Sequence, residues 1–299
     1  MTRHTPAPPV DIAAVIPGFA ALSRTTVRLH PRRGESPIDA AKMGGLILWP
    51  SEESWPTCDE HGSALIPVLQ LTAEDVPEVG FPSGADLFQL LWCPKLHEKL
   101  RPLYAPAARA FWRKRNAIQQ HLSVIPLPVR DRETDDLWPA ACILDPERVV
   151  EYPALFELAI EHPELRARVA NSKALRAIIE SHAGADEDAR TTVYASWLSV
   201  ADGTKVGGHP HWIQDPEWPR CECGLRMEYL LTVSSAEFDG GNWKRWLPDE
   251  ERHVSTANYA TRKRVQRAAN LMLGDMGNIN YFICRKCTGC PIEGIFQCS

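Results

Sequence analysis

The sequence has little of what would place it in a membrane, on nucleic acid or outside the cell. No uninterrupted apolar run approaches the roughly 18 residues that a membrane span requires. Lys and Arg number 33 against 38 Asp and Glu, so the net charge is −5 and no overall basic field points to nucleic acid. The apolar stretch near the N-terminus contains Asp11 and Pro17, which argues against a secretory signal. We therefore expect a cytoplasmic protein that binds neither membranes nor nucleic acid.

The motifs of common enzyme active sites are also missing. There is no Gly-x-Ser-x-Gly elbow, no His-Glu-x-x-His helix and no dinucleotide-binding fingerprint. Two Lys-x-Gly-Gly sequences occur, but neither has the Gly-Lys-Ser/Thr ending of a phosphate-binding loop. These absences favour a non-enzymatic function.

The sequence does contain nine cysteines and ten tryptophans in 299 residues. A hydrophobic fraction of 44% and a charged fraction of 24% are ordinary for a globular protein, which at this length has about two domains. The cysteines are clustered. Clustered cysteines in a cytoplasmic protein indicate metal binding rather than disulfides.

A repeated pattern divides the chain into two related halves. The tetrapeptide Lys-Met-Gly-Gly at 42–45 matches Lys-Val-Gly-Gly at 205–208. In that register further residues coincide, namely Trp49 with Trp212, Trp55 with Trp218 and Cys58 with Cys221, and a later apolar run aligns Cys93 with Cys284. Chance could produce one Gly-Gly match but not two tryptophans and a cysteine in the same register. We interpret the pattern as an internal duplication.

Hydrophobic periodicity completes the predicted organisation. Short apolar runs bounded by Gly, Pro and Asp predict strands in each half. Helical spacing of apolar residues over 106–122 predicts a helix. Asp145-Pro146-Glu147 has the residues of a capped helix start, and further helical segments are predicted from Pro163 and over 174–179. The predicted fold class is α+β: two related antiparallel β-rich halves joined by a helical connector. The predicted segments are an N-terminal extension (1–40), a first β-rich repeat with a helix (41–130), the connector (131–190) and a second β-rich repeat with the cysteine cluster (191–299).

The second half carries a strong metal-binding pattern. Cys221-x-Cys223 is followed about sixty residues later by Cys284-x-x-Cys287, and two thiolate pairs separated by a hairpin-like insertion are typical of a zinc ribbon. Zinc suits four thiolates because it is borderline soft and its d-electrons impose no geometry. We predict one structural zinc held by these four residues, with Cys290 as a substitute for Cys287.

The first half repeats the pattern with two histidines. Cys58-x-x-His61 and Cys93-x-x-x-His97 supply two cysteines and two histidines at the corresponding points, which is also a structural zinc set. The alternative is a degenerate copy that has lost its metal. A second zinc is therefore an open prediction.

A catalytic alternative depends on His209-x-His211, which follows the second Gly-Gly. Two histidines near a metal would suit a metal-dependent hydrolase, but the corresponding residues of the first half are Leu46 and Leu48. Alternating side chains on a loop at a strand edge are the simpler interpretation.

The motifs resemble those of the YwqG-like bacterial family, a family with a domain of unknown function. The resemblance rests on Lys-x-Gly-Gly, Trp-Pro-x-Cys-x-Cys-Gly, Gly-Asp-x-Gly, Phe-x-Cys-x-x-Cys and Phe-Gln-Cys-Ser, and it covers both halves. The second-half sequence Lys-Val-Gly-Gly-x-Pro-x-Trp also resembles a motif of programmed cell death protein 2 and its relatives. The matching residues are Lys205, Gly207, Gly208, Pro210 and Trp212. The chain departs from that pattern at Cys-x-Cys and at His61. The resemblance implies two similar β-rich halves and, for the second family, a dedicated chaperone of a small-subunit ribosomal protein.

We therefore expect a zinc-binding, non-enzymatic protein-binding module that holds a client protein. Lys205, Gly207, Gly208 and Trp212 are the predicted binding residues. Tryptophans often dominate interface hot spots, although Trp55 and Trp218 are expected to fill the small cores instead. The alternatives are an immunity protein that neutralises a toxin and a metal-dependent hydrolase that uses His209 and His211.

Overall fold

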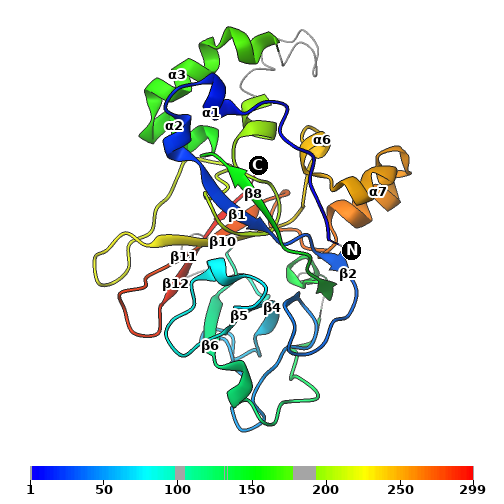
Figure 1. Ribbon diagram of the computed structural model, residues 1–299. Coiled ribbons are helices and arrows are strands. Elements are labelled where there is room, and N and C mark those ends of the chain that lie inside the picture. Colours follow the sequence, from blue (N-terminus) through cyan, green and yellow to red (C-terminus); the bar gives the residue numbers. More distant parts are fainter. Residues whose placement is uncertain (1, 98–104, 131, 133, 178–192, 299) are drawn as a thin grey trace.

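Two six-stranded antiparallel sheets form the centre of the protein (Figure 1). The computed structural model describes residues 2–97, 105–130, 132, 134–177 and 193–298. In sheet A the strand order is β12-β11-β10-β9-β1-β8, and in sheet B it is β2-β7-β3-β4-β5-β6. The strands of sheet A are β1 (Arg24–Arg28), β8 (Glu147–Glu151), β9 (Lys205–Gly207), β10 (Glu228–Ser234), β11 (Asn278–Ile283) and β12 (Ile292–Gln297). Those of sheet B are β2 (Arg32–Arg33), β3 (Lys42–Met43), β4 (Ile66–Thr72), β5 (Leu87–Trp92), β6 (Ala108–Arg113) and β7 (Cys142–Ile143).

The strands of the two sheets correspond one to one. Strands β3 to β6 lie side by side in chain order in sheet B, as β9 to β12 do in sheet A. The register is also the same: Met43 pairs with Leu69, and at the matching place Val206 pairs with Leu231. Even a local irregularity recurs, because the β4–β5 ladder shifts before Leu69 and the β10–β11 ladder shifts before Leu231.

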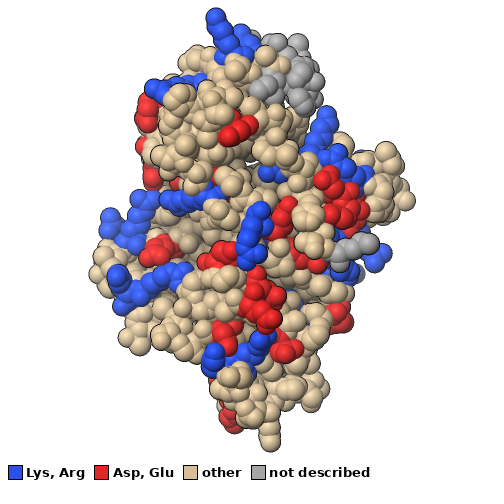
Figure 2. All heavy atoms as spheres, in the orientation of Figure 1, with Lys and Arg blue, Asp and Glu red and all other residues tan. Residues whose placement is uncertain are grey.

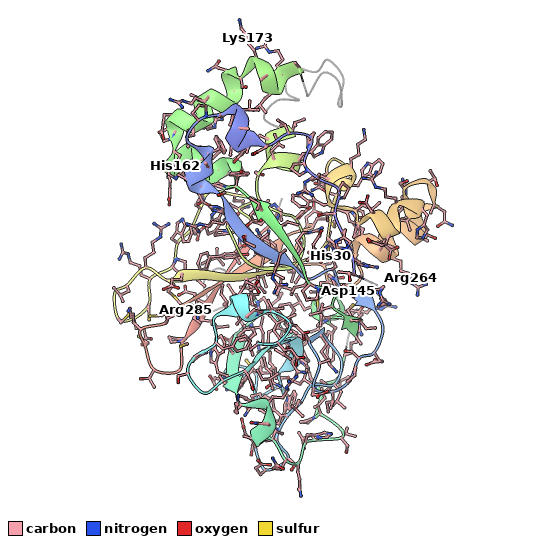
Figure 3. All side chains as sticks on the ribbon, viewed as in Figure 1. His30, Asp145, His162, Lys173, Arg264 and Arg285 are labelled. Carbon is pink, nitrogen blue, oxygen red and sulfur yellow. The ribbon has the colours of Figure 1, made fainter. Side chains whose placement is uncertain are left out.

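A two-stranded ribbon joins the sheets. Arg24 pairs with Glu151 in sheet A and Arg33 pairs with Cys142 in sheet B, and the register between these pairs never changes. The chain segments 24–33 and 142–151 therefore run antiparallel to each other through both sheets. Figure 3 shows His30 and Asp145 close together where the ribbon leaves one sheet for the other. These segments lie outside the predicted repeats, so each sheet draws strands from the predicted extension and the predicted connector.

The two sheets share one hydrophobic core. A single cluster of buried side chains contains residues of both sheets, among them Val27, Val68, Phe88, Leu231 and Ile279. Apolar side chains of one face are removed from water only because the other sheet covers them, so each sheet depends on the other for burial.

Helices cover the outer side of sheet A (Figure 1). One group packs around a core of its own that includes Phe19, Leu158 and Tyr194. Its members are α1 (Ile12–Val15), η1 (Phe19–Leu22), α2 (Leu155–Glu161), α3 (Pro163–Asn171) and the π-helix η5 (Tyr194–Leu198). A second group consists of α6 (Trp243–Trp246), η6 (Asp249–Thr256) and α7 (Tyr259–Gln266). The remaining short 3-10 turns are η2 (Pro77–Val79), η3 (Arg115–Ala117) and η4 (Asp135–Leu137). Among the described residues, no helix has both the length and the apolar character needed to cross a membrane.

The α+β fold class is confirmed, but two predicted helices are wrong. The range 106–122 forms strand β6 and the turn η3, and the predicted helix start at Asp145-Pro146-Glu147 leads into strand β8. The predicted connector therefore contributes a strand to each sheet as well as α2 and α3. Helical structure from Pro163 is confirmed, and a further helical turn covers 173–177, beyond which the predicted segment lies outside the described residues.

Candidate metal centres

Each sheet carries a short loop that faces the end of a central strand. An isolated bridge between Thr57 and Ala64 closes the first loop, and a bridge between Arg220 and Arg226 closes the second. The loops hold the first ligand pair of each predicted set, and the second pair begins directly after β5 at Cys93 and directly after β11 at Cys284. The two candidate centres thus occupy matching positions in sheets B and A.

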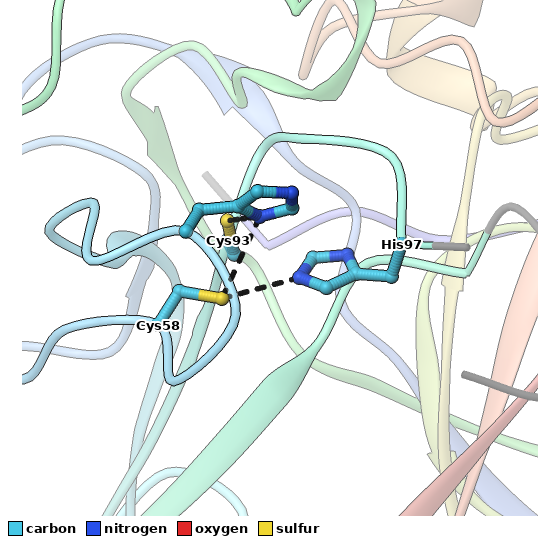
Figure 4. Close-up of side chains that lie close together, drawn as sticks. Cys58, Cys93 and His97 are labelled. Atoms are coloured by element: carbon cyan, nitrogen blue, oxygen red, sulfur yellow. Dashed lines mark hydrogen bonds between the residues drawn. The ribbon is translucent and has the colours of Figure 1, made fainter. Parts of the chain in front are cut away.

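The structure brings the four first-half residues together. One donor atom from each of Cys58, His61, Cys93 and His97 lies within 4.8 Å of the other three. Cys58 Sγ lies 3.2 Å from His97 Nε2, and Cys93 Sγ lies 3.5 Å from His61 Nδ1 (Figure 4). Two ligands on a tetrahedral zinc with ordinary Zn–S and Zn–N bonds are about 3.5 Å apart. The set can therefore hold a tetrahedral ion.

The four predicted cysteine ligands of the second half also converge. The sulfur atoms of Cys221, Cys223, Cys284 and Cys287 all lie within 4.8 Å of one another, and all nine cysteines of the chain are free. The Cys221–Cys287 and Cys223–Cys284 separations are 3.6 and 3.7 Å. Two thiolates on a tetrahedral zinc are about 3.8 Å apart, whereas a disulfide requires about 2.05 Å. The geometry fits a shared ion and not a disulfide.

Local electrostatics prepare some of these donors for a metal. The backbone N–H groups of Lys286 and Cys287 are directed at the sulfur of Cys284 and lower the pKa of its thiol to about 7. Burial lowers the pKa of His97, so its imidazole is held in the neutral form that binds metals. Burial raises the pKa of the Cys93 thiol to about 12, so an ion must displace a proton there.

Aromatic side chains support both loops in the same way. Trp49 and Trp55 pack with Cys58 and Cys93 in a small core on sheet B. The matching core on sheet A contains the corresponding residues Trp212, Trp218, Cys221 and Cys284. These cores hold Cys58 in place relative to Cys93 at the end of β5, and Cys221 in place relative to Cys284 at the end of β11. Trp49 and Trp212 are buried, so neither offers an exposed binding surface, whereas Trp55 and Trp218, the two expected to fill the small cores, are half-buried.

The Lys-x-Gly-Gly motif is a turn fastened by its own lysine. Lys42 Nζ donates to the carbonyl of Leu46 at 3.1 Å, and Lys205 Nζ donates to the carbonyl of His209 at 2.7 Å. Lys205 is fully buried, so this predicted binding residue holds the fold rather than meeting a partner. Gly207 and Gly208 have φ values of +68° and +79°, which favour glycine.

Glu151, which was not among the predicted site residues, completes this turn in sheet A. Its buried carboxylate accepts hydrogen bonds from Lys205 Nζ at 2.8 Å and from the backbone N–H groups of Ala201 and His209 at 2.6 and 2.5 Å. Because every charge is paired and hydrogen-bonded, burial of this ion pair is sustainable. No local pattern signals Glu151, since it lies 54 residues before its partner.

His209 and His211 lie in different surroundings. His209 is 2% exposed, and its Nδ1 is 3.5 Å from Glu157, whereas His211 Nδ1 is 3.3 Å from Asp202. Neither belongs to the two metal-ligand groups found in the described part of the chain. Cys290, predicted as a substitute ligand, is also outside these groups and has a φ of +48° in a turn that returns to Cys287.

Positive and negative side chains are interspersed on the face drawn in Figure 2. Arg285, labelled in Figure 3, illustrates this mixing, because it donates to Glu228 of sheet A and to the carbonyl groups of Val79 and Gly80.

Comparison with known proteins identifies a family. No curated protein matches the chain at a significant level. A family model described as "Domain of unknown function (DUF1963)" matches residues 41–286, a range that begins at the first Lys-x-Gly-Gly turn and includes three of the four cysteines in the second ligand set. Because this range makes up well over half of the chain, the protein belongs to the DUF1963 family.

Proposed function

We propose that both centres bind zinc. The donors are thiolate sulfur and imidazole nitrogen, which zinc accepts in the combinations Cys₄ and Cys₂His₂. The separations between sulfur and nitrogen atoms support a tetrahedral ion in each set. Harder ions fit less well, since magnesium and calcium require oxygen ligands.

Both ions are structural. Each set supplies four protein donors, so a tetrahedral ion has no open position for water or substrate. Catalytic zinc keeps such a position. The ions instead tie a short loop to the end of a central strand, at Cys93 in sheet B and at Cys284 in sheet A.

An internal duplication explains why the two centres match. The shared strand order, the shared register and the recurring shift before Leu69 and Leu231 support it. The resemblance to YwqG-like proteins and to relatives of programmed cell death protein 2 supports it further. In the first half, His61 and His97 replace two of the four thiolates, which keeps a zinc set and changes its charge.

Two closed zinc centres leave neither metal a position for substrate, which favours a function in binding. We assign it the function of a non-enzymatic, protein-binding module in the cytoplasm, where reduced thiolates remain available for metal. The observation that carries this assignment is the pair of closed four-donor sets at matching positions. A bound client protein fits this architecture better than a chemical substrate does.

Metal analysis of the purified full chain tests the proposal. We expect two zinc ions per chain, one in Cys284→Ser, and two in the control Cys290→Ser, because Cys290 lies outside the ligand group. Affinity capture with zinc retained then compares the wild type with Cys284→Ser. A client whose recovery falls with zinc content supports a binding module. Chain purified without metal that remains fully folded, or zinc-dependent hydrolysis by the wild type, contradicts it.

A further inference from the structure

A cavity of about 250 Å³ lies at the edge of sheet A that β8 forms. Four parts of the chain line it, namely the N-terminal segment 8–12, the end of β8, the π-helix η5 and α6. Figure 1 shows the N-terminal segment running past α6 on its way to α1. The volume is slightly below the range of about 300–1,000 Å³ that is usual for drug-sized ligands, so a ligand here must be small. None of the proposed zinc ligands lines this cavity.

The lining residue Arg245 is a buried arginine whose guanidinium is incompletely hydrogen-bonded. Its side chain belongs to a residue that is 5% exposed, and its one hydrogen bond in the described part of the chain runs from Nη1 to the carbonyl of Pro6. Nε has no partner and is enclosed by protein atoms. Nη2 also lacks a partner among the described residues, yet unlike Nε it is not enclosed. Nη2 is therefore the donor through which a ligand can reach this charge.

A second buried arginine, Arg28, lies beside the same tryptophan and is fully hydrogen-bonded. The guanidinium carbons of Arg28 and Arg245 lie 5.1 and 3.9 Å from the centre of the Trp246 ring. All three nitrogen atoms of Arg28 donate to backbone carbonyl groups, which belong to Asp202, Trp246 and Glu237. Burial and the nearby charge of Arg28 lower the pKa of Arg245 to about 10. The surroundings of Arg245 thus disfavour its charge, and a bound anion would offset this.

The nearby carboxylates do not neutralise Arg245. Asp11, the one acidic side chain that lines the cavity, caps α1 by accepting the N–H group two residues further on at 3.0 Å. Glu147 attracts Arg245 only from a distance, and its oxygen atoms already accept hydrogen bonds from the backbone and hydroxyl of Thr5. Within the described residues Arg245 has no ion-pair partner. A buried charge without a direct counter-ion is costly, so the cavity is suited to a ligand that supplies one.

Indole hydrogen bonds hold the walls of the cavity in place. Trp246 Nε1 donates to the carbonyl of Ser196 at 2.9 Å, which ties α6 to the π-helix. Trp197 Nε1 donates to the carbonyl of Gly241 at 3.1 Å, so the π-helix is tied in turn to the residues before α6. Segments of π-helix are rare and are frequent at functional sites. The cavity is therefore preformed rather than dependent on a ligand for its shape.

We propose that this cavity binds a small organic carboxylate, in which one negative charge is carried on an apolar or aromatic body. The carboxylate accepts a hydrogen bond from Nη2 of Arg245, and the body lies against the lining side chains of Val150, Tyr152 and Trp197. One guanidinium balances one negative charge, whereas a phosphate ester carries about −1.5 to −2 at pH 7, which favours the carboxylate. The site goes beyond the protein-binding function proposed above, because it uses no zinc ligand and no client protein.

A ligand-observed NMR titration of the zinc-loaded full chain tests this binding. The probe is phenylacetate, and phenylacetamide is its neutral counterpart. We expect phenylacetate to bind at least about tenfold more tightly, because only the anion pairs with the guanidinium, and to raise the melting temperature with increasing concentration. Absence of phenylacetate binding, or equal binding of the amide, overturns the proposal. Tighter binding of phenyl phosphate than of phenylacetate would contradict a site for a single charge.

Variants separate this site from general attraction of anions. We expect Arg245→Met to weaken phenylacetate binding at least about tenfold while the chain stays folded, since the lost charge has no direct counter-ion. The matched control is Arg168→Met. Arg168 Nη1 also donates to one carbonyl, that of Pro17 at 2.9 Å, and Arg168 has no ion pair with a described residue, but it is exposed and does not line the cavity. Phenylacetate should bind this control as it binds the wild type.

Asp11→Asn provides a test that does not depend on the folding of Arg245→Met. Asparagine keeps the cap of α1 and removes the negative charge that lines the cavity, so phenylacetate should bind at least about twofold more tightly. Unchanged affinity in Arg245→Met, reduced affinity in Arg168→Met, or unchanged or reduced affinity in Asp11→Asn overturns the proposal.

Discussion

At the scale of single residues, two glycines of the second half share a left-handed backbone and differ in their surroundings. Gly208 and Gly224 have φ values of +79° and +84°. A Cβ at Gly208 would lie 2.0 Å from a carboxylate oxygen of Glu151 and 2.7 Å from Thr26, whereas a Cβ at Gly224 would meet nothing within 4 Å. Substitution by alanine therefore tests backbone strain alone at Gly224, and backbone strain together with a steric clash at Gly208.

We expect Gly224→Ala to lower the free energy of unfolding by about 1–2 kcal/mol, the cost of a left-handed alanine. Gly208→Ala should cost at least twice as much, because the new methyl group displaces the carboxylate that pairs with Lys205. Denaturant unfolding of both variants with intact metal measures the difference. Equal losses would mean that the Glu151 ion pair tolerates displacement.

His30 makes the stability depend on pH. Burial lowers its pKa to about 4, and its Nε2 lies 2.8 Å from the carboxylate of Glu147. The unfolded chain has a histidine pKa of about 6.5, so between pH 6.5 and 4 the unfolded state binds more protons than the folded state. The free energy of unfolding is therefore unaffected by the titration of His30 above pH 6.5, and it decreases as the pH falls from 6.5 toward 4.

We expect this histidine to account for about 3 kcal/mol of the loss over that range. The variant His30→Asn removes the titrating ring, and asparagine tolerates the φ of +45° found there. Its unfolding free energy should fall less steeply between pH 6.5 and 4 than that of the wild type. Both proteins lose metal in acid, so the difference between the two pH profiles isolates His30, and parallel profiles would refute its role.

At the scale of elements, the zinc loops should come loose independently of each other. The loop 57–64 and the loop 220–226 have separate ligand sets on separate sheets. Structural zinc contributes on the order of 10 kcal/mol in small sites, much more than the few backbone hydrogen bonds of either loop. Loss of one ion should therefore release its own loop first.

We expect Cys284→Ser to make 220–226 sensitive to limited proteolysis while 57–64 stays protected, and Cys93→Ser to show the reverse. Mass spectrometry of the first cleavage products identifies the loop that opens. Cleavage of both loops in either variant would indicate that the centres are coupled. If neither loop is cleaved, the proposal that zinc holds these loops in place is wrong.

The sequence predicts the ligand groups better than it predicts the elements between them. Cysteine and histidine spacing marks loop positions directly, so all eight predicted ligands converge in two sets. Strand β6 escapes detection because Ala107, Ala110 and Phe111 imitate a helical stripe, while every residue of this edge strand is only half-buried and gives no alternation. At Asp145-Pro146, a helix cap and a strand entry have the same local residues. The segment forms a strand because it pairs with the N-terminal segment, and those partner residues lie more than a hundred residues away in the sequence.

At the scale of the whole molecule, the ribbon and the shared core make the two halves one cooperative unit. Sheet A requires β1 and β8, which the second repeat does not contain, and the core between the sheets mixes residues of both. Burial of apolar area provides most of the folding free energy, and neither half retains it alone.

We expect the fragment 191–299 to remain unfolded in the presence of zinc, although it contains all four of its cysteine ligands. The full chain with both metals should unfold in one calorimetric transition whose van't Hoff and calorimetric enthalpies agree. Dispersed NMR signals from the isolated fragment, or two separate transitions in the full chain, would show that the halves fold independently.

The ribbon also sets the order in which the chain can fold while it is being synthesised. Strand β1 pairs with β8 on one side and with β9 on the other, and 127 residues separate Arg24 from its partner Glu151. At 5–20 residues per second, a ribosome takes about 6 to 25 seconds to deliver that partner. Sheet B can complete its strands when β7 emerges, but β1 waits with both edges open until β8 and then β9 follow. An unpaired strand can pair with other chains, so overproduction that crowds nascent chains together should cause aggregation through this N-terminal segment.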